Sequence, residues 1–387
     1  MTEKKFVYLD NAATTPMSDA VVEKMSEVYK KYYGNASSVY SVGRESNEVI
    51  TSARESISKC LNCDANEVFF TGCGTEADNW ALKGYAYANR KKGNHIITTK
   101  IEHHAILHSC EALEREGFEV TYLCVDEYGM IDLDELKKAI KPETILISVM
   151  YANNEVGTIQ PIKEACEIAH ENKIAFHTDA VQAVGAEKID FKALGVDMLS
   201  LSGHKFHGPK GIGALIIKKG TRIYPYMDGG AQERKMRGGT ENIGGIVGMA
   251  GALKEATDNM EKRQAIIKQN RDYLKNEIEK RIPDIKYNGH PEKRLNNNAN
   301  FCFRYIEGES LLLWLDLNGI CASSGSACTS GSLDPSHVLL AMGLPHEIAH
   351  GSLRLTISSD TTKEDIDYTV DKLAQTVEKL RAMSPLC

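Results

Sequence analysis

Lys205 stands in the stretch of this chain with the clearest chemical potential, His204-Lys205-Phe206-His207. The stretch directly follows an apolar run, Met198–Leu201, with the length and composition of a buried strand, and several glycines come after it. A lysine on the rigid end of a strand can form a Schiff base with a carbonyl compound if burial or neighbouring cations lower its pKa. A glycine-rich hairpin with a solvated lysine is the alternative interpretation, and residues elsewhere in the chain decide between the two.

Polar residues also follow the other apolar runs that we expect to be strands. The carboxyl ends of parallel strands lie at one edge of a sheet, where ligands bind in open α/β folds, so these residues are expected to meet around Lys205. The groups that follow successive strands are Gly74-Thr75, Glu102-His103-His104, Asn153-Asn154-Glu155, Asp179 with Gln182, and Ser202 with His204.

Asp179, Gly74 and Thr75 narrow the kind of cofactor that could bind at this edge. An aspartate that ends an apolar strand is costly unless a cation pairs with it, and a protonated pyridine nitrogen is such a cation. A glycine turn at a helix start can hold a phosphate, although a glycine-rich helix cap is the simpler reading of Gly74-Thr75 alone. Together these groups predict pyridoxal 5'-phosphate (PLP), bound covalently to Lys205. A nicotinamide cofactor is disfavoured because no G-x-G-x-x-G motif opens a helix after the first strand of the series.

Cys328 lies in a second unusual stretch, Cys321–Pro335, built almost wholly from small residues. Long loops of this kind are usually functional or disordered, and an accessible thiol in one is expected to be reactive. A flexible linker with an incidental cysteine is the alternative. Further on, Arg354 falls in a strand-like run, where it could clamp a substrate carboxylate or form an ordinary surface ion pair.

The composition excludes several classes of protein. The chain has 387 residues, 42% hydrophobic and 26% charged, which is typical of a globular protein. Its net charge of −7 argues against a nucleic-acid or membrane-surface binder. No run approaches the about 20 apolar residues of a membrane-spanning helix, and the N-terminus lacks the apolar core of a signal peptide, so a cytoplasmic location is expected.

Ten cysteines without a signal peptide indicate free thiols in a reducing compartment. Four of them fall within apolar patterns and are expected to be buried and inert: Cys110, Cys124, Cys166 and Cys302. Cys60 and Cys63 form a lone C-x-x-C pair, and the absence of a second pair argues against a structural zinc site.

The elements that must position these residues form two groups. Between residues 68 and 217, strands alternate with amphipathic helices, which predicts an α/β unit around a mainly parallel sheet. After residue 256 the pattern changes to a long charged helix, 258–281, a strand, 299–304, and a final helix, 362–383, whose Thr362-x-x-Asp365 start suits a capping box. We therefore expect a large domain over 15–255 and a smaller α+β domain formed by 1–14 with 256–387.

The motifs in order identify a family resemblance. The chain resembles the cysteine desulfurases of the NifS/IscS type, which belong to class V of the fold-type I PLP enzymes. The stretches that carry the resemblance span nearly the whole chain: Tyr8–Pro16, Gly74–Glu76, Glu102-His103, Asn153–Glu155, His177–Gln182, Ser202–Lys205, Arg237–Asn242 and Ser323–Cys328.

The resemblance implies roles for individual residues. Lys205 would hold the cofactor, Asp179 would pair with its pyridine nitrogen, Gln182 would bond its phenolic oxygen, and His103 would stack on the ring and shuttle protons. Asn154 and Arg354 would orient the substrate carboxylate. The phosphate would be held by Gly74, Thr75, Ser202 and His204, with Thr240 reaching it from the other subunit of a homodimer.

The implied reaction converts L-cysteine into L-alanine and leaves the sulfur on Cys328 as a persulfide for an acceptor such as an iron–sulfur scaffold protein. A thiol with an ordinary pKa of about 8.5 is only a few per cent thiolate at neutral pH, so a cation must activate it, and His103 is the candidate. The sequence ends soon after its last expected helix, whereas housekeeping members have a longer tail that docks the scaffold. This favours a dedicated sulfur-supply role.

Two alternatives stay open at this point. The first is selenocysteine lysis or another class V reaction, against which the Cys328 loop argues. The second is a non-catalytic sulfur carrier, which would have no use for Lys205 and Asp179.

Overall fold

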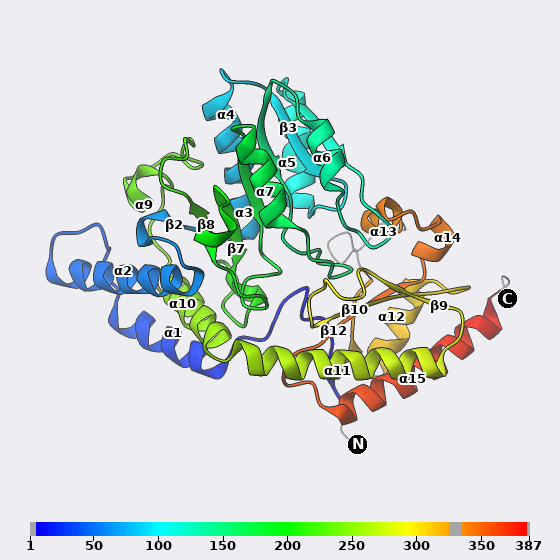
Figure 1. Cartoon of the computed structure of the whole chain (residues 1–387). Helices are drawn as coiled ribbons and strands as arrows, with labels where there is room; N and C mark the ends of the chain where they lie inside the picture. The colour runs from blue at the N-terminus through cyan, green and yellow to red at the C-terminus, as the bar shows by residue number, and fades with distance from the viewer. Residues whose placement is uncertain (1–4, 325–333, 385–387) are drawn as a thin grey trace.

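A seven-stranded sheet forms the centre of the larger part of the molecule. The structure, a computed structural model, describes residues 5–324 and 334–384. The strands lie in the order β2-β8-β7-β6-β5-β3-β4, and Figure 1 shows β2, β8 and β7 next to one another. Their bounds are β2 (Val68–Thr71), β3 (His95–Thr99), β4 (Glu119–Leu123), β5 (Thr144–Ser148), β6 (Ala175–Asp179), β7 (Met198–Ser202) and β8 (Gly213–Ile217). The predicted α/β class with a mainly parallel sheet is confirmed.

Strand β8 is the exception to the parallel arrangement. It follows β7 after only a short turn, which cannot carry the long crossover that a parallel neighbour needs. The strand therefore runs antiparallel between β2 and β7. Because both neighbours are antiparallel to β8, they are parallel to each other, and the carboxyl ends of β2 and β7 lie at the same edge. The residues that follow them, Gly74 and Lys205, meet for this reason.

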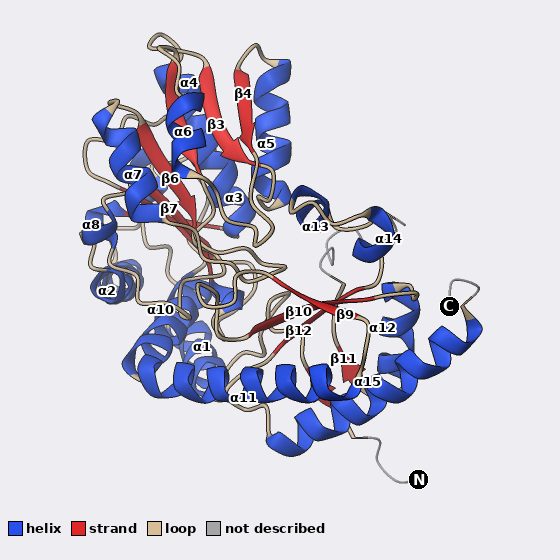
Figure 2. Ribbon diagram, turned by 45° about the vertical axis from the view of Figure 1, so that its right-hand side comes forward, coloured by secondary structure: helices blue, strands red, loops and turns tan. Residues whose placement is uncertain are grey.

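Helices cover both faces of the sheet (Figure 2). Successive strand residues point to opposite faces, so Phe70 packs in the core with α2 (Ser41–Leu61) and α10 (Ile243–Asp258), and Phe69 packs on the other side against Trp80. The first face also carries α1 (Asp19–Lys31), α6 (Leu133–Ala139), α7 (Ile162–Glu171) and α8 (Phe191–Leu194). The second carries α3 (Gly74–Asn79), α4 (Tyr85–Asn89) and α5 (His104–Arg115).

The helical segment between β2 and β3 is interrupted. Residues 80–84 form a π-helical turn between α3 and α4. Here Trp80 Nε1 donates to the carbonyl of Tyr224 at 2.8 Å, and a side chain at Gly84 would collide with that same carbonyl. The interruption thus lies where this segment packs closely against the backbone at Tyr224.

A second hydrophobic core lies beside the first. It joins a three-stranded antiparallel sheet to two long helices and to the N-terminal residues Val7 and Leu9. The elements are β9 (Ile285–Asn288), β10 (Asn298–Phe303), β12 (Ser352–Thr356), α11 (Met260–Arg281), α12 (Gly308–Leu317) and α15 (Lys363–Met383), with β1 (Val7–Tyr8) paired to β11 (Ile320–Cys321). The capping box at Thr362 and Asp365 is present, with both reciprocal bonds at 3.1 Å. The division into domains over 15–255 and 1–14 with 256–387 stays a prediction.

Three short helices complete the described part of the chain: α9 (Gln232–Lys235), α13 (His337–Ala341) and α14 (His346–Ala349). Within that part, no helix is both long and apolar enough to span a membrane.

Candidate active site

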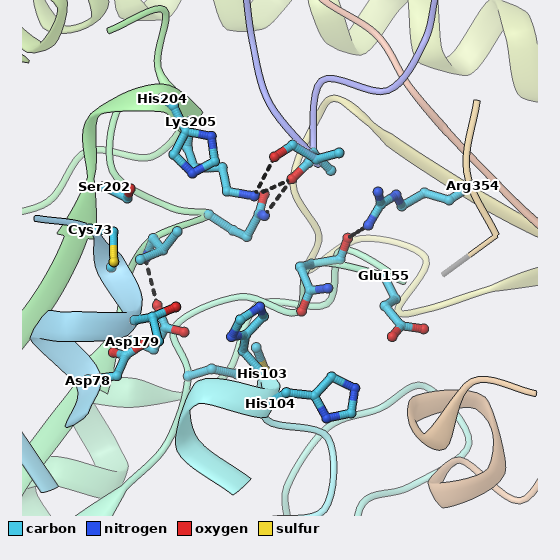
Figure 3. A pocket seen from close by; sticks show the side chains of 18 of the residues that line it. Cys73, Asp78, His103, His104, Glu155, Asp179, Ser202, His204, Lys205 and Arg354 are labelled. Carbon is cyan, nitrogen blue, oxygen red and sulfur yellow. Dashed lines mark hydrogen bonds between the residues drawn. The ribbon is translucent and has the colours of Figure 1, made fainter. Parts of the chain in front are cut away.

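A cavity of about 350 Å³ opens at the edge where β2, β5, β6 and β7 end. Segments outside the large sheet also contribute to it, since Arg354 reaches it from β12 and Ala12 from the N-terminal segment. Ten of the residues singled out from the sequence line its wall together: Gly74, Thr75, His103, Asn154, Asp179, Gln182, Ser202, His204, Lys205 and Arg354 (Figure 3). The expected convergence of the strand ends on one edge is therefore observed.

Lys205 occupies the last position of a single 3₁₀ turn, Gly203–Lys205, that directly follows β7. Its Nζ donates to the carbonyl oxygens of Ala12 at 2.6 Å and Ala13 at 2.9 Å. Gln182 Nε2 donates to the same Ala12 oxygen at 2.9 Å. The N-terminal segment thus lies across the lysine and fixes its amine inside the cavity.

Asp179 is the last residue of β6, and its side chain is buried. Its Oδ1 accepts a hydrogen bond from the backbone N–H of Val181 at 2.9 Å. Burial raises the pKa of Asp179, while this bond and the positive charge of Lys205 act in the opposite direction. A bound cation next to Asp179 would further stabilise the ionised carboxylate against the free-energy cost of its burial.

His103 caps α5, and this role fixes its neutral tautomer. Its Nδ1 accepts the backbone N–H of Ala105 at 3.1 Å, so Nε2 carries the ring proton. Burial, then Lys205 and three neighbouring histidines, lower the pKa of His103 to about 4. These surroundings favour the neutral ring, whereas the expected activation of the Cys328 thiol needs a cation, so that role of His103 stays a prediction that its described surroundings do not support.

Ser202 and Gly74 form a narrow recess on one wall of the cavity. Ser202 Oγ is buried and has no hydrogen-bond partner among the residues that the structure describes. A side chain at Gly74 would approach Val181 Cγ2 to 2.8 Å and Ser202 Cβ to 3.3 Å, so only glycine leaves the recess open. His204 lies nearby, with Nδ1 3.1 Å from Thr14 Oγ1. An unsatisfied hydroxyl in an open recess fits a phosphate group, and the lysine and carboxylate elsewhere on the wall fit the rest of PLP.

Arg354 is a buried residue, with 2% of its surface exposed, so the alternative of an ordinary surface ion pair is wrong. Its Nη1 donates to the carbonyl of Asn154 at 2.8 Å and its Nη2 to Asp10 Oδ1 at 2.9 Å. Its Nε is buried without a partner in the described residues. The guanidinium is thus held in place while part of its donor capacity remains for an anion.

One predicted site residue that the structure describes lies away from this cavity. Thr240 is exposed and does not line it. Cys328 lies outside the described residues. The segment before Thr240 is anchored by Arg237, whose Nε lies 2.9 Å from Glu76 Oε1.

The expected burial of the core cysteines holds for three of the four. Cys110, Cys166 and Cys302 are buried. Burial raises the pKa of Cys166 to about 12 and that of Cys302 to about 11. Cys124 is exposed, contrary to expectation, because it follows β4, the edge strand of the large sheet.

Five ionisable residues on the cavity were not assigned a role from the sequence: Cys73, Asp78, His104, Glu155 and His337. Asp78 stands four positions after Gly74, a spacing that places both on the same face of a helix, and this signal could have found it. Glu155 was noted only as part of a polar strand end; its carboxylate accepts a hydrogen bond from Ser336. His337 begins α13, and no local pattern marks it.

Comparisons with known proteins agree closely with one another. The profile of the family described as "Aminotransferase class-V" matches residues 7–369. The chain is 57% identical to cysteine desulfurase IscS of Methanosarcina thermophila over 385 residues, which cover 100% of this chain and 95% of the relative. It is 55% identical to cysteine desulfurase IscS of Clostridium botulinum, over 99% of this chain and 97% of the relative.

Solved structures of NifS-like proteins are also similar to this chain. A NifS-like protein superimposes with a TM-score of 0.92 at 38% identity, over 97% of this chain and 100% of the other. A NifS-like protein from Rickettsia africae superimposes with a TM-score of 0.88 at 30% identity, over 97% of this chain and 100% of the other.

Proposed function

The chain belongs to the class-V aminotransferase family and, within it, to the PLP-dependent cysteine desulfurases, and on this basis we propose how its residues divide the reaction. The substrate is L-cysteine, which is converted into L-alanine as the sulfur passes to an acceptor. The observation that carries the assignment is the meeting of Lys205, Asp179 and Arg354 on one cavity. The relatives favour desulfuration over selenocysteine lysis, and a pure sulfur carrier would need no such cavity.

In this proposal Lys205 and Asp179 would hold the cofactor. Lys205 would bind it covalently, Asp179 would pair with its pyridine nitrogen, and Gln182 would bond its phenolic oxygen. The phosphate group is held by residues of the recess and its rim, Gly74, Thr75, Ser202 and His204. When bound, PLP supplies the electron sink that labilises bonds to the substrate α-carbon and takes up the electron pair of the breaking C–S bond.

Arg354 and Asn154 orient the substrate carboxylate. A guanidinium can give two parallel hydrogen bonds to a carboxylate, and the buried Nε of Arg354 lacks a partner in the described structure. Asn154 contributes from the loop after β5, where its carbonyl already fixes Nη1 of Arg354. The carboxylate would thus satisfy a buried donor and gain a hydrogen bond that is strong in a site shielded from water.

Lys205 and His103 handle protons. The ring of His103 points into the cavity (Figure 3), where its Nε2–H can donate a hydrogen bond. Because its pKa is lowered, His103 would hold an added proton only briefly at neutral pH before passing it on. Lys205 would supply the amine that moves the proton of the substrate α-carbon.

Cys328 is the proposed nucleophile. Its thiolate forms an S–S bond with the substrate sulfur as the bond from that sulfur to Cβ breaks. The described residues on either side of 325–333 are tied to the cavity wall: Ser323 pairs with the backbone of Arg354, with N–O separations of 2.6 and 3.2 Å, and Ser336 bonds Glu155. The described residues that flank this segment thus lie at the cavity, which supports the proposed role of Cys328.

A homodimer completes the proposal. The exposed position of Thr240, away from its own cavity, suits a residue that reaches the phosphate of the partner subunit. The sulfur acceptor is a protein, such as an iron–sulfur scaffold, and the free thiols of the chain suit the reducing conditions of the cytoplasm.

The direct test measures L-alanine and sulfide released from L-cysteine by the PLP-loaded protein in the presence of a thiol reductant. Equal amounts of the two products are expected. Alanine without sulfide, or no reaction with L-cysteine, would contradict the proposed function.

A further inference from the structure

Two carboxyl groups lie at the same end of the cavity. Asp78 projects from α3 and is 1% exposed, and Asp179 ends β6 and is 6% exposed. Figure 3 shows both at the end of the cavity away from Arg354. Two ionised carboxylates so close in a buried site repel each other strongly, so one of them is expected to keep its proton.

The groups around Asp78 do not offset a negative charge on it. Its ionisable neighbours are Asp179, Glu102, Cys73 and His177, of which only histidine can be cationic. Each acidic neighbour, when ionised, would further raise the free energy of the negatively charged form of Asp78. Its Oδ1 is buried and lacks a hydrogen-bond partner within 5–324 and 334–384.

His177 does not supply the missing positive charge. Its Nε2 lies 3.8 Å from Asp78 Oδ1. However, the ring is fully buried, and its two nitrogens pair with the hydroxyls of Ser148 at 2.9 Å and Ser200 at 3.0 Å. One of these hydroxyls can accept from the protonated ring nitrogen while the other donates to the unprotonated one, which suits the neutral ring. Burial accordingly lowers the pKa of His177 to about 3.

The ionised form is more stable at Asp179 than at Asp78. It accepts the backbone N–H of Val181, and the ammonium of Lys205 attracts it. Hydrogen bonds to a carboxylate and a nearby cation both favour the ionised form, whereas Asp78 is stabilised in that form only by the Ser200 hydroxyl. When two acids compete for one proton, the difference in their surroundings assigns it.

We propose that Asp78 is a neutral carboxylic acid that adjoins an ionised Asp179, so that one negative charge rather than two faces the pyridine end of the cavity. Asp78 is thus a positioning residue that acts through Asp179. The inference rests on the proposed role of Asp179 toward the cofactor, but the protonation state of Asp78 follows from its own surroundings.

Infrared spectroscopy tests the protonation state without using turnover. The holoenzyme is prepared with ¹³C-carboxyl aspartate, so that aspartic acid bands separate from those of the buried Glu102. A labelled C=O band of a protonated acid is expected at pH 7 in the wild type, lost in Asp78→Asn and kept in Asp179→Asn. If the wild type shows no such band, or if Asp78→Asn keeps it, the proposal is wrong.

Cofactor affinity supplies a second readout with isosteric variants. Asp78→Asn replaces a neutral group by a neutral group, so its dissociation constant for PLP should stay within about threefold of wild type, whereas Asp179→Asn should weaken PLP binding at least about tenfold. A loss in Asp78→Asn as large as that in Asp179→Asn would mean that Asp78 carries charge, and would overturn the proposal. Unchanged PLP binding in Asp179→Asn would instead contradict the proposed role of Asp179, while the infrared result would still decide the state of Asp78.

Discussion

Nη2 of Arg354 lies 2.9 Å from Oδ1 of Asp10, in an ion pair that joins residues 344 positions apart. The two residues lie on adjacent segments, since Asp10 forms a β-bridge with Thr356, which is in β12 together with Arg354. Arg354 is almost fully buried, and its other terminal nitrogen bonds the carbonyl of Asn154. The N-terminal segment therefore does more than cover Lys205: it also provides the anion that fixes the proposed carboxylate clamp.

Asp10→Asn should weaken the binding of L-cysteine more than it slows the reaction. The amide cannot hold the guanidinium as firmly as the carboxylate does, and a charge-assisted hydrogen bond is lost in a buried site. We expect KM for L-cysteine to rise about tenfold and kcat to change less than about threefold. The control is Asp258→Asn, which removes an exposed ion pair with Lys254 and should leave both constants unchanged. Equal KM values for Asp10→Asn and wild type would refute the positioning role.

Lys205→Ala should abolish turnover and the covalent attachment of PLP. No second amine on the described wall of the cavity takes its place, because Lys205 is the one lysine that lines it. Borohydride reduction followed by peptide mass measurement checks the attachment directly. Lys210→Ala removes an exposed lysine five residues away and should behave as wild type. Near-normal desulfuration by Lys205→Ala would contradict the assignment of Lys205 as the residue that binds PLP.

Thr240→Val and Lys205→Ala should complement each other if subunits share their active sites. Each homodimer is expected to be impaired. A hybrid, however, contains one site with its own lysine and the partner's threonine, so activity should return in mixed samples. The control mixes Lys205→Ala with Asp179→Ala. Both residues line the cavity of their own subunit, so each site of the hybrid stays defective and no activity should return. No recovery in a proven Thr240→Val hybrid would show that Thr240 does not act across the interface.

Cys328→Ala should retain PLP and still change its visible spectrum when L-cysteine is added, but it should release no sulfide. Sulfur-labelled L-cysteine, given without reductant, should leave a label on the Cys328 peptide that a thiol reductant removes. The exposed Cys124 offers a matched control, because it is accessible but does not line the cavity. Cys124→Ala should keep full activity. Label on Cys124, or sulfide production by Cys328→Ala, would contradict the proposal.

The low pKa of His103 predicts a dependence of stability on pH. Its pKa of about 4 in the folded state lies below the ordinary value of 6.5, so the unfolded chain binds more protons between these two values. The free energy of unfolding should therefore fall as the pH drops from 6.5 toward 4, with a contribution from His103 of up to about 3 kcal/mol.

His103→Asn isolates this contribution, because asparagine can still accept the N–H of Ala105 as a helix cap. Urea unfolding at several pH values should show a smaller decrease in this variant than in wild type. His346→Asn, at an exposed position, should follow the wild-type curve. Identical curves for His103→Asn and wild type would mean that His103 is not held neutral by the fold.

Much of the fold and of the site follows from local sequence. The apolar run before Lys205 predicts β7, and Gly203, which directly follows that strand, begins the turn that ends at the lysine. The capping box at Thr362 is likewise encoded within four residues. Periodicity and capping report which residues become buried in a strand or helix, because these properties depend on near neighbours. The positions of Lys205, Asp179 and His103 at strand ends could therefore be predicted before any contact was known.

Only the tertiary structure decided how these groups affect one another. Asp10 meets Arg354, Asp78 adjoins Asp179, and Cys124 reaches solvent through the order of the strands, which short-range patterns do not contain. The same holds for the neutral state of His103, which the sequence suggested was cationic. Charge states depend on desolvation and on distances to charges far away in the chain, and these are set when the two cores pack against each other.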